Sequence, residues 1–109
     1  MEKIRIHKEL KVYKLSFEAG MEVFEFSKKF PSEERFSLTD QVRRSSRADS
    51  GIIAEAWRKR RYPKSFVAKL NDAEAVETQV WLDYALACNY INLAEYKPLY
   101  ENTSISLPC

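Results

Sequence analysis

The chain contains too few turn-forming residues for a protein built from many short strands. Among its 109 residues there are only two glycines and four prolines. Apolar residues instead recur every three or four positions, which places them on one face of a helix. The sequence therefore predicts an all-α fold. A chain of this length with 45% apolar residues can bury one core, so we expect a single domain over residues 1–109.

Four helices are expected, over about residues 9–29, 38–60, 65–91 and 93–101. Pro31 ends the first, and Pro63 marks the break after the second. The segments from Ser37 to Asp40 and from Asn92 to Glu95 both have the capping-box pattern that opens a helix, although Asp40 replaces the usual Glu or Gln. Short connections favour antiparallel neighbours, so we predict an antiparallel up-and-down four-helix bundle with a short fourth helix.

Polar residues interrupt the faces of the second and third helices that would otherwise form the core. A buried carboxylate needs a cation or several hydrogen-bond donors, because an unpaired buried charge is costly. We therefore predict a buried polar network in which an arginine, Arg44 or Arg47, meets acidic residues. Its expected members are Gln41, Arg44, Glu55 and Glu77.

Glu55 and Glu77 could instead form a carboxylate pair for acid–base chemistry or metal binding. Di-metal bundles usually add Glu-x-x-His motifs on two helices, and the only histidine, His7, is far from both glutamates in the sequence. His7 is interpreted as an exposed bystander. The chain also has no nucleophile motif and no glycine-rich phosphate loop. We expect no enzymatic activity, no metal and no cofactor.

Positive charge is concentrated in the first part of the chain. Residues 1–64 contain 16 lysines and arginines against 10 aspartates and glutamates, whereas residues 65–109 contain 2 against 6. Four cations are consecutive at Arg58 to Arg61, beside the rings of Trp57 and Tyr62. Cations at a helix C-terminus complement the macrodipole, but one or two would suffice. Phosphate-neutralising cations with stacking rings are typical of RNA-binding surfaces.

Three interpretations of the basic cluster remain open: a nucleic-acid contact, a solvated helix end, or an ion-pairing surface between subunits. If it binds nucleic acid, Trp57 is a further candidate stacking ring. The candidate nucleic-acid-binding residues are Arg43, Arg47, Arg58, Lys59, Arg60, Arg61, Tyr62 and Lys64.

Several short elements together resemble one known family. They are Phe30-Pro31, Gln41-x-Arg43-Arg44, Ala54-Glu55 and Glu77-Thr78-Gln79-x-Trp81-Leu82. From about Leu10 to Tyr100 the chain is similar to the four-helix-bundle proteins encoded by intervening sequences in 23S rRNA genes. The resemblance implies an up-and-down bundle that forms homo-oligomers, with pentameric rings in some relatives. A related group, the accessory proteins of diversity-generating retroelements, forms basic pentamers that engage a reverse transcriptase and nucleic acid.

Together these observations predict a non-enzymatic RNA- or nucleic-acid-binding accessory protein that acts as a homo-oligomer. The broad apolar surface of the first helix favours association. The alternative is a protein-protein interaction module whose basic turn docks on the acidic third helix of a neighbour, around Asp72, Glu74 and Asp83. No apolar run approaches the ~18 residues of a spanning helix, and no secretory signal begins the chain, so we expect a cytoplasmic protein without membrane contact.

Overall fold

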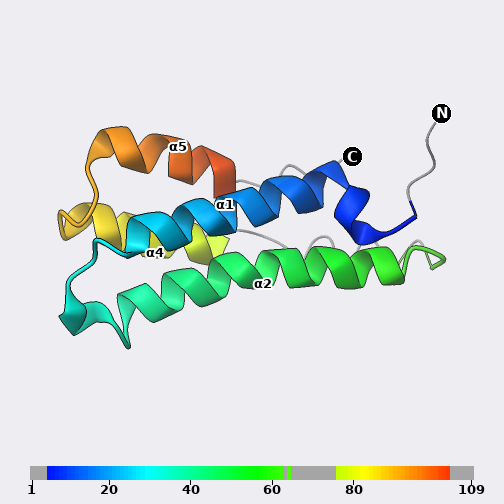
Figure 1. Ribbon diagram of the computed structural model, residues 1–109, viewed down its shortest axis with the longest axis horizontal. Helices are drawn as coiled ribbons and strands as arrows, with labels where there is room; N and C mark the ends of the chain where they lie inside the picture. Colours follow the sequence, from blue (N-terminus) through cyan, green and yellow to red (C-terminus); the bar gives the residue numbers. More distant parts are fainter. Residues whose placement is uncertain (1–4, 63, 65–75, 104–109) are drawn as a thin grey trace.

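The computed structural model describes residues 5–62, 64 and 76–103, and in these ranges the chain forms helices and no strand (Figure 1). The α-helices are α1 (Lys11–Ser27), α2 (Leu38–Arg58), α4 (Val76–Ala87) and α5 (Leu93–Thr103). Two short 3-10 helices, η1 (His7–Glu9) and η2 (Ser32–Glu34), precede α1 and α2. The fold class is all-α, as predicted. The first part of the expected third helix, residues 65–75, lies outside the described residues.

The α-helices contact one another in a closed order. α1 packs against α2 and α5, and α4 packs against the same two helices. Figure 1 shows α1 and α2 side by side along the length of the molecule, with α4 and α5 together near one end. This arrangement is compatible with the expected antiparallel up-and-down bundle. The buried apolar core contains Val23, Phe30, Leu38, Val42, Leu82, Ala85, Ile91 and Leu99.

Small residues line the contact between α1 and α2. The face of α1 toward α2 carries Ser16, Ala19 and Gly20, and a Cβ atom added to Gly20 would lie 3.8 Å from the carbonyl oxygen of Ser46. The hydroxyl oxygens of Ser16 and Ser50 are 3.0 Å apart across this contact. Because small side chains fill the interface, several large apolar residues of α1 remain at the surface, and they include Leu15, Phe17 and Met21.

α4 ends at Ala87, four residues before the predicted end of the third helix. Asn89 has a positive φ of 63°, the left-handed conformation that commonly follows a helix. The amide of Tyr90 donates to the carbonyl of Ala85 at 2.9 Å, and that of Asn89 donates to Leu86 at 3.0 Å. This pair of bonds is the Schellman motif, which satisfies the last carbonyls and stops the helix.

The two predicted capping boxes have different outcomes. At the start of α5, the Glu95 amide donates to Asn92 Oδ1 at 2.8 Å and the Asn92 amide donates to Glu95 Oε1 at 3.0 Å, which confirms the prediction. At the start of α2 the prediction is wrong, because Ser37 does not cap the helix through its side chain. Its hydroxyl donates instead to Glu34 Oε1, at 2.5 Å. This glutamate also accepts the Leu38 amide at 3.4 Å.

Polar contacts connect the helices at the end where α4 meets α5. The Tyr90 hydroxyl donates to Glu34 Oε2 at 2.8 Å, which raises the pKa of Tyr90 to about 12. Hydrogen bonds from Ser37 and Tyr90 lower the pKa of Glu34. The Tyr96 hydroxyl donates to Asp83 Oδ1, which raises the pKa of Tyr96 to about 12. In the part of the chain that the structure describes, no helix is both long and apolar enough to cross a membrane.

Candidate nucleic-acid interface

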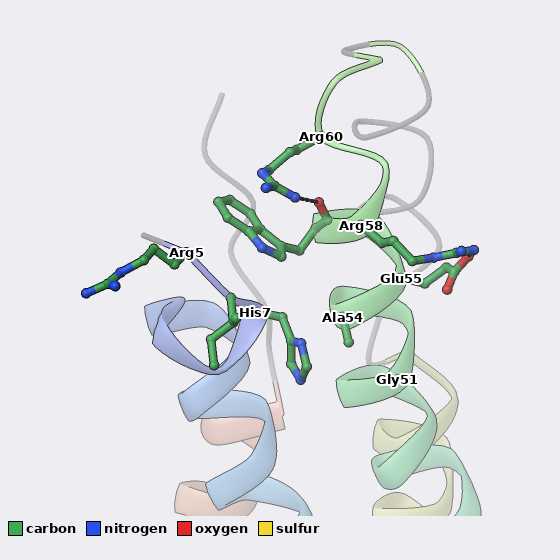
Figure 2. Close-up of a pocket in the computed structure, with 9 residues that line it drawn as sticks. Arg5, His7, Gly51, Ala54, Glu55, Arg58 and Arg60 are labelled. Atoms are coloured by element: carbon green, nitrogen blue, oxygen red, sulfur yellow. Dashed lines mark hydrogen bonds and ion pairs between the residues drawn. The ribbon is translucent and has the colours of Figure 1, made fainter. Parts of the chain in front are cut away.

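The segment before α1 folds back against the C-terminal end of α2. η1 contacts α2, and the two elements line a cleft of about 400 Å³ (Figure 2). Arg5, Ile6 and His7 form one side of the cleft, and residues of α2 with Arg60 form the other. Two segments separated by some 50 residues thus bring cations to the same end of the molecule. We call the residues Arg5, Arg58, Lys59, Arg60, Arg61, Tyr62 and Lys64 the basic end.

Trp57 and Arg60 form the wall of this cleft. The Arg60 guanidinium carbon lies 4.3 Å from the centre of the Trp57 ring, and Arg60 Nη1 donates to the Trp57 carbonyl at 3.1 Å. The ring contact is a cation–π interaction. Because two contacts hold the guanidinium, it is oriented in advance, and its remaining N–H groups can donate to an anion.

Arg58 has a different environment from Arg60. Its guanidinium donates to Glu55 Oε1, and this contact raises the pKa of Arg58 above its ordinary value. Figure 2 shows Arg58 and Glu55 directed away from the side of α2 that faces Arg5 and His7. Arg5, Arg58 and Arg60 all line the cleft, but the charge of Arg58 is partly offset by Glu55.

The remaining cations of the basic end lie at the surface beyond α2. Arg61 and Lys64 are exposed, Lys59 is half-buried, and the Tyr62 side chain is 69% exposed. The structure records no ion pair for Lys59, Arg60, Arg61 or Lys64 with any residue it describes.

Arg43 and Arg47 form a second group of cations, separate from the basic end. Their guanidinium carbons lie 4.7 Å and 5.6 Å from the centre of the Phe24 ring on α1, and Arg43 Nε donates to Ser27 Oγ at 2.6 Å. At 1.5 Å per residue, Arg47 is about 17 Å from Arg58 along α2. The sequence-based candidate residues therefore form two groups rather than one continuous patch.

The predicted buried polar network is wrong in its membership. Arg44 is exposed, with its side chain 74% accessible, and it pairs with Asp40 at 3.6 Å on the same helix. Glu55 pairs with Arg58, while Glu77 is exposed and accepts the Trp81 indole N–H at 3.3 Å. Gln41 is half-buried and lines a different cleft. These long side chains reach solvent or a neighbour on their own helix instead of the interior.

Short polar side chains occupy the interior instead. Thr78 Oγ1 donates to Ser45 Oγ at 2.9 Å, which connects α4 to α2. Asp49, on α2, is the buried carboxyl group and is only 7% exposed. Burial, together with the negative charge of Glu77, raises the pKa of Asp49 to about 7.

Arg5 and His7 are the site residues that the sequence did not indicate. His7 is half-buried, lines the cleft, and its ring centre lies 4.8 Å from that of Tyr13, so it is not an exposed bystander. The pattern Arg5-Ile6-His7-Lys8 carries charge and a ring ahead of α1, but nothing in it specifies that the segment folds onto α2.

The acidic docking surface expected on the third helix is described only at Asp83, which accepts a hydrogen bond from Tyr96. Asp72 and Glu74 lie outside the described residues.

The described residues contain no group of three or more His, Cys, Asp or Glu side chains that could hold a metal ion.

Comparison with known proteins shows a similarity to a protein family. The model of the 23S rRNA-intervening sequence protein family matches residues 8–106. No curated protein and no solved structure matches the chain.

Proposed function

The chain belongs to the 23S rRNA-intervening sequence protein family, and from this premise we propose that it is a non-enzymatic accessory protein that binds RNA or another nucleic acid through its basic end. The observation that carries the proposal is the convergence of Arg5 and Arg60 around Trp57 in one cleft. Cations beside a partly exposed aromatic ring suit a ligand that has both phosphates and bases. A cytoplasmic location, where RNA is available, belongs to the same proposal.

The number of cations at this end supports the proposal over a simple helix terminus. The Arg60 contact with the Trp57 carbonyl satisfies one group of the helix end, and Arg58 is paired with Glu55. Lys59, Arg61 and Lys64 remain as additional positive charges near the same turn. A helix C-terminus gains only about 0.3–1 kcal/mol from each nearby cation, and the effect fades beyond its last turn. Binding of an anionic ligand would explain the additional positive charges of Lys59, Arg61 and Lys64.

Salt-dependent binding of RNA tests this function. We expect a fluorescently labelled single-stranded RNA to bind at low salt, with affinity that falls steeply as salt increases. Replacing four residues of the basic end with alanine, in the variant Arg58→Ala, Lys59→Ala, Arg60→Ala and Arg61→Ala, should abolish binding or lower the slope of log affinity against log salt by about 2–3.

A control variant removes the same amount of charge elsewhere. The exposed cations Lys29, Arg35, Arg44 and Lys97 lie outside the basic end, and replacing all four with alanine should leave most of the RNA affinity intact. If RNA does not bind to the unmodified protein at low salt, or if both variants lose affinity equally, the proposed function is wrong.

A second candidate function is a protein-protein interaction module, with the basic turn contacting a subunit or another protein. Exposed apolar side chains favour association, because monomeric proteins rarely leave such patches in water. Leu15, Phe36 and Tyr84 are more than half exposed. We propose that the protein is a homo-oligomer, for which the resemblance to the family favours a pentamer. Under this alternative the four alanine replacements at the basic end should change the oligomer mass in light scattering, and RNA binding should be undetectable.

A further inference from the structure

Two clefts lie along α1 and α2 between the basic end and the second group of cations. The cleft at the basic end is lined by His7 and Gly51, and a neighbouring cleft of about 250 Å³ is lined by Tyr13 and Ser50. Gly51 and Ser50 are adjacent on α2, and the rings of His7 and Tyr13 are in edge contact at 4.8 Å. The two clefts are therefore neighbours on the surface of α1 and α2, and we call the two together the groove.

Aromatic rings follow one another along this groove. After His7 and Tyr13, the Phe17 ring lies 6.3 Å from that of Tyr13 and nearly parallel to it, with an interplanar angle of 27°. Tyr13, Phe17 and Met21 are spaced four residues apart, so they share one stripe of α1. Phe17 is 53% exposed, and Met21 is 47% exposed. Phe17 is therefore the exposed ring of this stripe, with the half-buried Tyr13 ring beside it, and an exposed ring is a surface on which a base can stack.

Both ends of the row carry arginines. Arg60 and Arg5 flank the cleft at the basic end, and Arg47 lines the neighbouring cleft, where it is the only charged residue among the described residues. Arg43 and Arg47 sit over Phe24 just beyond it. Glu55 is the only acidic residue among those described around the two clefts, and it pairs with Arg58. The charge of the groove therefore complements an anionic ligand along its length.

We propose that this groove holds a single strand of nucleic acid, with its phosphates on the arginines at the two ends and its bases against the rings between them. The inference rests on the proposed function and adds to it the kind of nucleic acid and its path. A duplex hides the faces of its bases, so it could use the arginines but not the rings. From Arg60 to Arg43 the path is about 25 Å long at 1.5 Å per residue, which equals about seven stacked nucleotides at 3.4 Å each.

The test uses two substitutions within the groove but away from the basic end. Phe17→Leu removes a ring while keeping an apolar side chain, and Arg47→Gln removes the charge at the far end. Arg44→Gln is the matched control, because Arg44 is an exposed arginine of α2 that lines neither cleft. Circular dichroism verifies that each variant is folded.

The probes are a 12-nucleotide single-stranded oligo(U), the same length of oligo(A), and a 12-base-pair RNA duplex. We expect Phe17→Leu and Arg47→Gln each to weaken binding of both single strands about fivefold or more, whereas Arg44→Gln stays within about twofold, because one lost base stack or phosphate contact is of this size. A four-nucleotide oligo(U) should bind more weakly than the 12-nucleotide strand, since it cannot span both groups of arginines.

Tryptophan fluorescence gives a direct readout of the path. With Trp81→Phe, Trp57 is the only remaining tryptophan, and single-stranded RNA should quench its emission while the duplex does not. One outcome would overturn the groove proposal while the proposed function stands. In it, single strands bind and the quadruple basic-end variant abolishes this binding, but the affinities of Phe17→Leu and Arg47→Gln equal that of Arg44→Gln. Equal affinity for the duplex, with equal quenching, also overturns it. If neither form of RNA binds the unmodified protein, both proposals fail.

Discussion

The buried carboxyl group of Asp49 on α2 experiences the negative charge of Glu77 on α4. Asp49 is 7% exposed, and its burial, with the repulsion from Glu77, raises its pKa from 3.8 to about 7. Below about pH 7, the folded protein therefore favours the neutral form of Asp49. This relationship makes the stability of the contact between α2 and α4 depend on pH near neutrality.

Replacing Asp49 with asparagine should stabilise the protein more at pH 8 than at pH 5. Between about pH 4 and pH 7 the folded state retains a proton on Asp49 that the unfolded chain has lost, so the free energy of unfolding decreases as pH rises through this range. Above pH 7 the charged carboxylate is present in the folded interior at full cost. Asparagine does not titrate, so its advantage should grow over this interval. Urea unfolding at pH 5 and pH 8 measures the difference.

Two further variants separate the causes of the Asp49 effect. Glu77→Gln removes the repelling charge, so it should lower the pKa of Asp49 and raise stability at pH 8 relative to pH 5. Glu25→Gln is the control, because Glu25 is an exposed partner of Lys28, and its effect should stay within about 0.5 kcal/mol at both pH values. If Asp49→Asn has the same effect at pH 5 and pH 8, the buried carboxyl group does not titrate as described.

Asn92 should contribute more to stability than Ser37, although both residues open a capping-box pattern. Asn92 accepts the Glu95 amide and donates its own amide to the Glu95 carboxylate. Asn92→Ala should therefore lower the free energy of unfolding by about 1 kcal/mol. Ser37→Ala should cost less, since the Ser37 hydroxyl contacts an exposed Glu34 carboxylate rather than an α2 amide. Paired urea denaturation curves compare them, and an equal loss would contradict the assignment.

Local sequence signals predicted the helices well, because caps, prolines and apolar spacing act within a few residues. The capping box at Asn92 and the stop before Pro31 are of this kind. The capping prediction for Ser37 is wrong because its backbone, with φ −122° and ψ −101°, lies outside the extended region that a capping residue adopts, and the pattern from Ser37 to Asp40 does not reveal this conformation. The end of α4 was placed too late because Asn89 adopts a left-handed conformation, which apolar periodicity does not reveal.

The candidate site was predicted only in part. The cations and rings from Trp57 to Lys64 are consecutive in the sequence, so they were visible as a cluster. The contributions of Arg5 and His7 depend on how η1 docks against α2, which is a long-range contact. The buried network was misassigned for a related reason. Glu77 interrupts the apolar face of the third helix, and Arg44 was chosen as a cation that could meet a buried carboxylate, but both long side chains reach solvent.

Asn89 should tolerate glycine but not alanine. Its φ of 63° is unfavourable for residues with a Cβ atom, and asparagine bears this conformation better than most. Asn89→Gly should be neutral or stabilise the protein, whereas Asn89→Ala should lower the free energy of unfolding by about 1 kcal/mol. Thermal unfolding of the two variants compares them. If the Asn89→Ala variant is as stable as the Asn89→Gly variant, the Schellman motif does not require the left-handed conformation.

Replacing Arg60 with lysine should weaken single-stranded RNA binding even though the charge is kept. The guanidinium of Arg60 is planar, and it lies over the Trp57 ring while it donates to the Trp57 carbonyl. A lysine ammonium is a compact charge that does not reproduce this orientation. We expect affinity to fall about threefold or more with a nearly unchanged salt slope, because the number of phosphates neutralised stays the same. Arg61→Lys is the control, since Arg61 is exposed, and it should change affinity less than twofold. If both lysine variants behave alike, charge alone accounts for binding at the basic end.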